Sequence, residues 1–401
     1  MKARFFRGRR RAPLAIASAV IAATALTGAA TAAEPLDELP AELRALYSEG
    51  IPVGPSAYDD FEMPAPPWRW CHSESYMGNP WRVNMTAELR RLVGVAEKEG
   101  LVSGFEMSDS NGDVTQQIAQ IRAFIDKGCS VITTIAGSST ALNEVIEAAY
   151  NAGIPVVTTA SAVTSPYAIN IQHNHNVWGY NMGEGVARYL NGEGRVLMVE
   201  GIPGSPIVEQ ENSGGLRAFE KYPGIQIVGT VSGMWTANVT KSVVLQALAT
   251  NPIPIDAVWT TGSETRVIAE AFEEAGRPTP LVTGSMSGDA LGYWKENPEK
   301  LRFYGGAILP TVAAHNTFRA AVRLLEGQQP IVSTIIVPVP EIRQEDLGAW
   351  AAPCMTPESG SIFPVSPNDP ISEEQLNGYF RKGAATPVYD YGSTPNPCEQ
   401  G

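Results

Sequence analysis

The feature of this sequence that most restricts its fold is an alternation of short apolar runs with longer segments of helical periodicity. Residues 114–127 carry apolar side chains at helical spacing and are followed by Gly128, a residue type that commonly ends helices. Residues 131–135 form an apolar, β-branched run, and a second helix and strand follow at 140–151 and 154–159. Such an alternation predicts a parallel sheet covered by helices.

The alternation resumes after a short break and continues to residue 326. Strand-like runs and helical segments take turns from 177 to 284, and a strand at 303–309 precedes a helix at 311–326. We therefore expect an α/β fold of two doubly wound parallel-sheet lobes. Because ligands of such sheets bind at the carboxyl ends of the strands, the cleft between the lobes is the expected site.

The first 33 residues have the pattern of a secretory signal peptide. They contain six basic and no acidic residues, then an Ala-rich apolar run at 14–26 and small residues up to Ala33. The apolar run is too short to span a bilayer, and no Cys stands at the cleavage point to carry a lipid. We expect export to the periplasm with cleavage near Ala33, by the general secretory or the twin-arginine route.

Removal of this segment makes an acidic chain more acidic. Of the 29 basic residues 23 remain, against 42 acidic ones, which gives a formal net charge of −19. A strongly acidic surface argues against nucleic acids and anionic membranes as partners. The roughly 365 remaining residues suffice for about two domains. We expect a monomer. The expected divisions of the chain are a signal peptide at 1–33, an extended N-terminal segment at 34–67, a first lobe at 68–172 plus 309–337, a second lobe at 173–308 and a C-terminal extension at 338–401.

The four cysteines belong to a chain in which export would permit disulfides. Cys354 and Cys398 bracket a tail rich in Pro, Gly and Ser with little core of its own, and we predict that they pair. Cys71 and Cys129 lie in apolar runs, where we expect buried free thiols. The Cys and His residues have no zinc-site spacing, so neither a metal nor a cofactor is predicted.

Several short motifs within residues 69–335 occur together in one known protein family. Gly78-Asn79-Pro80-Trp81 is similar to the family's turn after the first strand. The other motifs are Ser110-Asn111-Gly112-Asp113, Gln117–Ile121 with Ile125 and Gly128, Ser138–Ala141, Ala152-Gly153-Ile154-Pro155-Val156-Val157, Glu200-Gly201-Ile202-Pro203-Gly204 and Gly215-Leu216-Arg217-Ala218-Phe219. Together these motifs resemble the ribose-type (type I) periplasmic sugar-binding proteins of ABC transporters.

The resemblance implies two lobes joined by a three-segment hinge, with crossings near 160–171, 284–288 and 308–310. A ligand that touches both lobes binds the closed form more tightly and shifts the population toward closure. The implied protein is the substrate-binding component of an ABC importer, which presents a small organic solute to a membrane permease. The alternative is a ligand-sensing periplasmic protein that feeds a receptor or sensor kinase.

An enzymatic function is not expected. Residues 284–288 have Met286 where the serine-hydrolase pattern Gly-x-Ser-x-Gly requires Ser. The sequence has no phosphate-binding loop and no dinucleotide fingerprint after a strand.

The resemblance places five candidate ligand contacts around the cleft. Asn79 and Trp81 stand where the family has a polar contact and a stacking ring, although Trp81 also suits the core face of a helix. Arg82 could pair with a carboxylate of the ligand, or it could be a solvated cation at the start of a helix. Trp235 suits a second stacking ring or ordinary packing, and Asn174 lies beside the first expected crossing.

Seven further positions depart from the polar pattern of the family's pocket. A free sugar needs many hydrogen bonds in a pocket because its hydroxyl groups lose their water on binding. We therefore expect either a sugar-like ligand or a less polar one, such as an aromatic compound or a modified sugar. Glu209 suits a cationic or hydroxyl group of the ligand, or a solvated helix face. The seven positions are Ile135, Ala160, Ser161, Glu209, Gly262, Met286 and Ile308.

Overall fold

The computed structural model describes residues 35–47, 51, 53–300, 302–383 and 391–399, which belong to one compact unit. The predicted signal peptide at 1–33 and its cleavage near Ala33 lie outside the described residues. None of the described helices is both long and apolar enough to cross a membrane.

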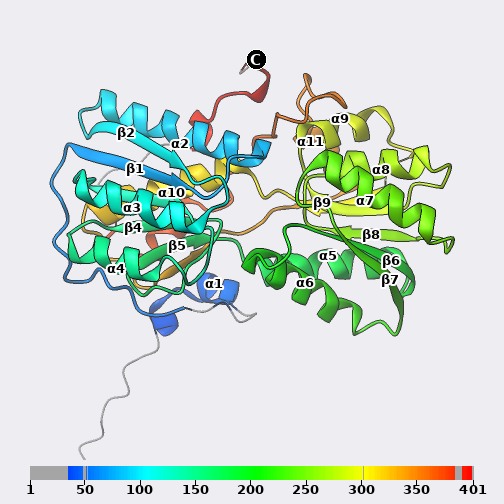
Figure 1. Ribbon diagram of the computed structural model, residues 1–401, viewed down its shortest axis with the longest axis horizontal. Coiled ribbons are helices and arrows are strands. Elements are labelled where there is room, and N and C mark those ends of the chain that lie inside the picture. The colour runs from blue at the N-terminus through cyan, green and yellow to red at the C-terminus, as the bar shows by residue number, and fades with distance from the viewer. Residues whose placement is uncertain (1–34, 48–50, 52, 301, 384–390, 400–401) are drawn as a thin grey trace, which may run out of the picture. The chain divides into compact units, whose positions relative to one another are not determined.

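The first lobe is a parallel sheet with helices on both faces (Figure 1). Within the described residues it has six strands, in the order β11-β5-β4-β3-β1-β2. Helices α2 and α10 pack on each other on one face, and α3 and α4 cover the other. The strands are β1 (Trp68–Glu74), β2 (Val102–Asp109), β3 (Val131–Ile135), β4 (Val156–Thr159), β5 (Ala168–Gln172) and β11 (Thr334–Ile336); the helices are α2 (Pro80–Lys98), α3 (Val114–Asp126), α4 (Asn143–Asn151) and α10 (Pro310–Leu325).

The second lobe repeats this topology. Its sheet, as described, has the order β12-β10-β9-β8-β6-β7, with β12 antiparallel at one edge. Helices α5 and α6 pack together on one face, and α7, α8 and α9 follow one another on the other. The strands are β6 (Glu193–Glu200), β7 (Gly224–Ser232), β8 (Ala257–Thr260), β9 (Leu281–Ser285), β10 (Arg302–Gly306) and β12 (Glu341–Ile342); the helices are α5 (His175–Tyr189), α6 (Pro206–Phe219), α7 (Ala237–Thr250), α8 (Thr265–Glu274) and α9 (Gly288–Glu296). The predicted α/β fold of two doubly wound lobes is confirmed.

From β1 to β12, the described chain crosses between the sheets at 173–174, 307–309 and 337–340. The crossing predicted near 308–310 is confirmed. Those predicted at 160–171 and 284–288 were wrong. Strand β5, inside the first of these ranges, pairs with β4 in the same sheet, and residues 286–287 connect β9 to α9 within the second lobe. Strand β5 was not recognised in the sequence because it contains polar residues such as Asn170. The Asn170 side chain is satisfied inside the sheet, where it accepts a hydrogen bond of 2.7 Å from Thr158.

Capping side chains start helices at the carboxyl ends of the strands. Asn79 accepts a hydrogen bond from the backbone N–H of Arg82, and Pro80 occupies the first position of α2. Asp113 and Asn174 cap α3 and α5 in the same way. These caps fix where each loop ends, and therefore which residues face the cleft.

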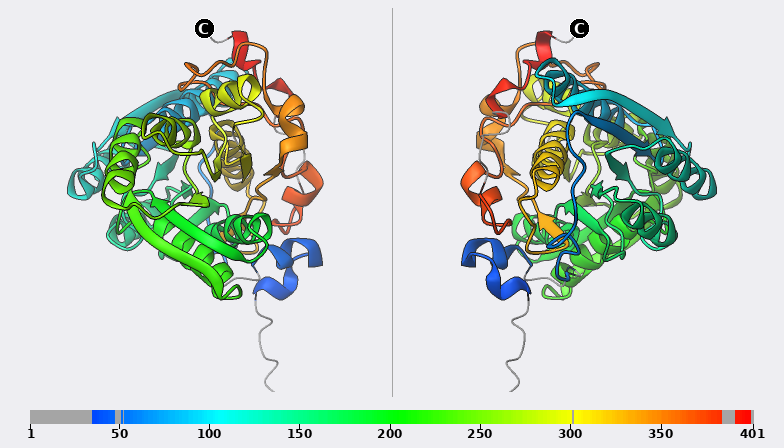
Figure 2. Two further views of the ribbon diagram at one scale, coloured as in Figure 1. Left: turned by 90° about the vertical axis from the view of Figure 1, so that its right-hand side faces the viewer. Right: turned by 90° about the vertical axis from the view of Figure 1, so that its left-hand side faces the viewer.

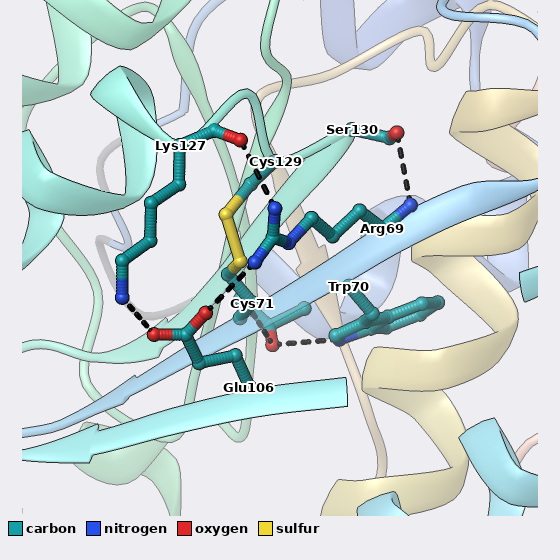
Figure 3. The surroundings of a disulfide bond; sticks show 8 residues. Arg69, Trp70, Cys71, Glu106, Lys127, Cys129 and Ser130 are labelled. Atoms are coloured by element: carbon teal, nitrogen blue, oxygen red, sulfur yellow. Dashed lines mark hydrogen bonds and ion pairs between the residues drawn. A yellow bond between two sulfur atoms is a disulfide. The ribbon is translucent and has the colours of Figure 1, made fainter. Parts of the chain in front are cut away.

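Cys71 and Cys129 form a disulfide, so the prediction of free thiols was wrong (Figure 3). Cys71 is in β1, and Cys129 lies just before β3, the strand that pairs with β1. Their Cα atoms are 6.0 Å apart, a usual disulfide spacing. Nearby, Glu106 pairs with Arg69 and Lys127. The sequence does not show that β3 lies beside β1, and for this reason the Cys71–Cys129 disulfide was not predicted.

The described part of the C-terminal extension contains short helices and turns and the predicted Cys354–Cys398 disulfide. Its described part meets the N-terminal segment, where Arg381 pairs with Glu38. Figure 2 shows the orange-to-red extension running past α10 toward the blue N-terminal helices. The short elements are α1 (Ala41–Arg44), α11 (Leu347–Trp350) and α12 (Glu373–Asn377), with 3-10 turns at Pro35–Glu38, Ala45–Tyr47, Gln344–Asp346, Tyr391–Ser393 and Pro397–Glu399.

Candidate ligand-binding site

A cavity of about 450 Å³ is lined by residues from both lobes and from the C-terminal extension. It lies at the carboxyl ends of the strands, as expected for doubly wound sheets. Seven of the predicted site residues line it: Asn79, Trp81, Arg82, Ala160, Trp235, Gly262 and Ile308. A second cavity, of about 500 Å³, lies between β7 and α7 and shares none of its lining residues with the first.

The first lobe contributes mainly the turn between β1 and α2. The indole N–H of Trp81 donates a 2.9 Å hydrogen bond to the Ile308 carbonyl, which lies on a crossing segment. The Arg82 guanidinium donates to Glu74, which is fully buried, and to Ser75, both at 3.0 Å. The positive charge of Arg82 is therefore balanced within the lobe, without a ligand carboxylate.

The second lobe presents Trp235 directly after β7. Trp235 has a φ of +49°, and Ala160 on the opposite lobe has a φ of +60°. Non-glycine residues rarely adopt this left-handed region, and such strain gathers at functional sites. The Trp235 ring lies against Gly201 and Gly262; a Cβ added at Gly262 would lie 3.0 Å from the ring atom Cδ1. The missing side chains at these glycines therefore make room for the indole.

A buried polar triad closes one side of the cavity. His175 Nδ1 lies 3.0 Å from Glu211 Oε1, and the hydroxyl of Thr261 donates to Glu211 Oε2 at 2.6 Å. Among the described residues, His175 Nε2 has no hydrogen-bond partner. The inventory of site candidates drawn from the sequence missed all three residues. The buried face of α6 could have been recognised from the helical spacing of Val208, Glu211 and Gly215. That spacing would have pointed to Glu211.

A second polar group surrounds the start of α8. Arg266 Nε donates to Asp289 at 3.0 Å, and Arg266 also pairs with Glu270. Burial, together with repulsion from Asp289, raises the pKa of Glu264 to about 7. A substantial share of this carboxyl is therefore protonated at neutral pH and able to donate a hydrogen bond.

The other five predicted site residues do not line the cavity. Ile135 and Met286 are fully buried in the hydrophobic core, and Ser161 is buried beside Ala160. Glu209 is exposed on the outer side of α6. The amide of Asn174 is used within the protein, since it caps α5 and donates to the Leu46 carbonyl at 3.0 Å.

A family model described as the periplasmic binding protein domain matches residues 73–329. The chain belongs to this family. The resemblance to ribose-type binding proteins of ABC transporters is thereby confirmed, and members of the family act outside the cytoplasm.

Three curated relatives of this family member are solute-binding proteins. The xylitol-binding protein of Mycolicibacterium smegmatis is 23% identical over 179 residues, which are 44% of this chain and about half (51%) of the relative. The ribose import binding protein of Bacillus subtilis is 24% identical, covering 56% of this chain and 72% of the relative. The galactofuranose-binding protein of Escherichia coli is 25% identical, covering 52% and 67%.

Solved structures show the same fold. An ABC transporter solute-binding protein from Thermobispora bispora is 28% identical with a TM-score of 0.67, covering 73% of this chain and 90% of its own. The fructose-binding periplasmic domain of a hybrid two-component system is 20% identical with a TM-score of 0.61, covering 70% and 92%. Both comparisons leave part of this chain uncovered.

Proposed function

We propose that this protein is the substrate-binding component of an ABC importer, which captures a neutral small organic solute between its lobes and presents it to the permease. The observation that carries the proposal is the cavity lined by strand ends of both lobes. A solute held there contacts both lobes and therefore binds the closed form more tightly than the open form. The ratio of the two affinities sets how far the population shifts toward the closed form. No step in this role requires catalysis.

The Ile308 carbonyl supports closure as the working motion. It accepts hydrogen bonds from Trp81 of the first lobe, at 2.9 Å, and from Ser285 of the second lobe, at 3.4 Å. Because Ile308 lies on a crossing segment, a movement of one lobe against the other changes the geometry of at least one of these bonds. Ligand contact with Trp81 is thereby coupled to the hinge.

The charges around the cavity support a neutral ligand. Arg82 and Arg266 are paired with carboxylates of the protein, and Glu211 accepts hydrogen bonds from within it. The two tryptophans, with Ile207 and Val267, offer apolar surface to one face of a ring or chain. A sugar, a polyol or a modified sugar with one apolar face fits this combination, and the three curated relatives are named for xylitol, ribose and galactofuranose.

Export and monomeric action complete the proposal. The basic, apolar and small-residue pattern of 1–33 supports secretion to the periplasm with cleavage near Ala33. The acidic mature chain supports a diffusing binding protein with no nucleic-acid partner.

Ligand sensing is the second candidate function, supported by the fold shared with the fructose-binding domain of a two-component system. Deleting the gene separates the two functions. If the protein serves import, the deletion strain takes up less of a radiolabelled solute. Its catabolic genes are still transcribed once the solute is generated inside the cell. Sensing predicts unchanged initial uptake and a loss of the transcriptional response.

A thermal-shift screen tests the binding function itself. Mature protein is heated with D-ribose, xylitol, myo-inositol, D-allose, phenyl β-D-glucopyranoside or benzoate. We expect a saturable rise in melting temperature with at least one neutral compound and none with benzoate. A response to benzoate alone would overturn the neutral-ligand assignment, and no response to any compound would count against the proposed function.

A further inference from the structure

The C-terminal extension is attached to the second lobe by its first half. The Lys295 ammonium group at the end of α9 donates a 2.7 Å hydrogen bond to the Met355 carbonyl. At the start of the same helix, the Gly288 N–H donates to the Ile362 carbonyl, also at 2.7 Å. Met355 and Ile362 are therefore anchored at the two ends of α9.

The second half of the extension is attached to the first lobe through α10. Arg319, which is 1% exposed, donates to Asp369 at 2.7 Å, and the fully buried Arg323 pairs with Glu373. Further along, Thr394 lies 3.1 Å from His315. Because buried guanidinium groups without carboxylate partners are costly, these ion pairs hold the extension firmly on α10.

Around residues 360–363 the extension lines the cavity and also contacts the first lobe. Gly360 and Phe363 belong to its lining, and the Ser361 carbonyl accepts a 2.9 Å hydrogen bond from Asn84 of α2. Phe363 is only 6% exposed, yet none of the three hydrophobic clusters formed by the described residues includes it. The ring is thus enclosed beside the cavity and does not belong to either lobe's core.

The Cys354–Cys398 disulfide joins the two attachments covalently. Cys354 precedes Met355 on the second-lobe side, and Cys398 follows Thr394 on the first-lobe side. The bond closes a segment with a sequence separation of 44 residues. A disulfide placed in this way limits how far the two attachment points can separate.

We propose that the C-terminal extension is a third wall of the ligand site, in which Phe363 contacts the ligand and the Cys354–Cys398 disulfide limits the opening of the lobes. The proposal rests on the binding function proposed above. The wall selects ligands that place an apolar face against Phe363, since a fully hydroxylated face would lose its hydration there without compensation. The wall also adds a fourth connection between the lobes.

Two variants of neighbouring residues test the ligand contact. Calorimetric titration is carried out with whichever of xylitol, myo-inositol, D-allose and phenyl β-D-glucopyranoside the wild type binds. We expect F363A to weaken affinity about tenfold or more, as for a buried aromatic contact. The control V365A, which changes a side chain that packs on the core and does not line the cavity, should stay within about twofold. Equal affinities of F363A and wild type would overturn the contact.

A second measurement needs no ligand. Fluorophores on noncanonical residues at Glu147 and Glu220, exposed in the first and second lobe, report the distance between the lobes by energy transfer. We expect the double variant C354S/C398S to broaden the distribution toward longer distances. The double variant C71S/C129S, which lacks the disulfide inside the first lobe, should leave it unchanged. An unchanged distribution in C354S/C398S would overturn the restraint. If no compound binds the wild type, the proposed function fails, and this measurement still decides the restraint.

Discussion

The two lobes line the cavity in different ways. The first lobe contributes chiefly one continuous turn, residues 78–82. The second lobe assembles its share from separate segments: the loops after β7, β8 and β9 and the buried faces of α5 and α6. The first wall is therefore a local product of one strand–helix junction, whereas the second exists only after the whole lobe has folded.

The walls also differ in charge. The first carries Arg82, whose charge is balanced by Glu74 behind it. The second carries Glu211, Glu264 and Asp289, which lie among hydroxyl, imidazole and guanidinium groups. This difference indicates a division of labour. Under the proposed function, we expect the first lobe to supply a stacking surface and the second lobe to form hydrogen bonds with the ligand.

The largest effect is expected from W235A. Trp235 is the tryptophan that the second lobe contributes to the cavity lining, with a backbone in the left-handed region, and we propose that its ring stacks on the ligand. We expect affinity for the bound neutral compound to fall about 100-fold in calorimetric titration, as for aromatic hot spots. A fall smaller than about threefold would show that Trp235 only packs against Gly201 and Gly262.

A smaller effect is expected from E211A. The change leaves His175 and Thr261 without their carboxylate partner, so we expect about tenfold weaker binding. E209A, on the exposed side of the same helix, is the matched control and should bind like wild type. Equal losses in both variants would point to damage to α6 rather than to the site.

A still smaller effect is expected from W81F. Phenylalanine keeps an aromatic ring but loses the hydrogen bond from Trp81 to the Ile308 carbonyl. We expect about fivefold weaker binding, because one hydrogen bond contributes about 1 kcal/mol. Unchanged affinity would mean that this bond does not couple the ligand to the hinge.

The smallest effect concerns pH and Glu264. Its pKa is raised from 4.5 to about 7 in the folded protein, so the native state holds a proton that the unfolded state releases. Stability from this group is therefore lost as pH rises from about 4.5 to about 7. We expect E264Q to melt higher relative to wild type at pH 8 than at pH 5. An equal difference at both pH values would contradict the raised pKa.

The first wall was predictable from the sequence, and the second largely was not. Asn79, Trp81 and Arg82 lie together in the chain beside a helix-capping Asn-Pro, so a local pattern reveals them. Glu211 and His175 meet because α6 packs on α5, a contact that the local sequence does not encode. Glu209 was predicted as the contact on α6, but the residue on the buried face of that helix is Glu211, two positions further on.

The same reasoning explains the outcome for the disulfides. Cys354 and Cys398 bracket a tail with little core, and that composition suggested their pairing. Cys71 and Cys129 pair because β3 returns to lie beside β1. Phe363 was missed for a related reason, since nothing in the proline-rich tail indicates that it passes the cavity.

Calorimetric titration of the double variant W81A/W235A tests the central claim most directly. Wild-type protein and variant are titrated with the neutral sugars and polyols of the thermal-shift screen. The account predicts saturable one-to-one binding by the wild type to at least one compound and no measurable binding by the variant. Binding of the same compound with unchanged affinity in W81A/W235A would contradict a ligand held between the two lobes.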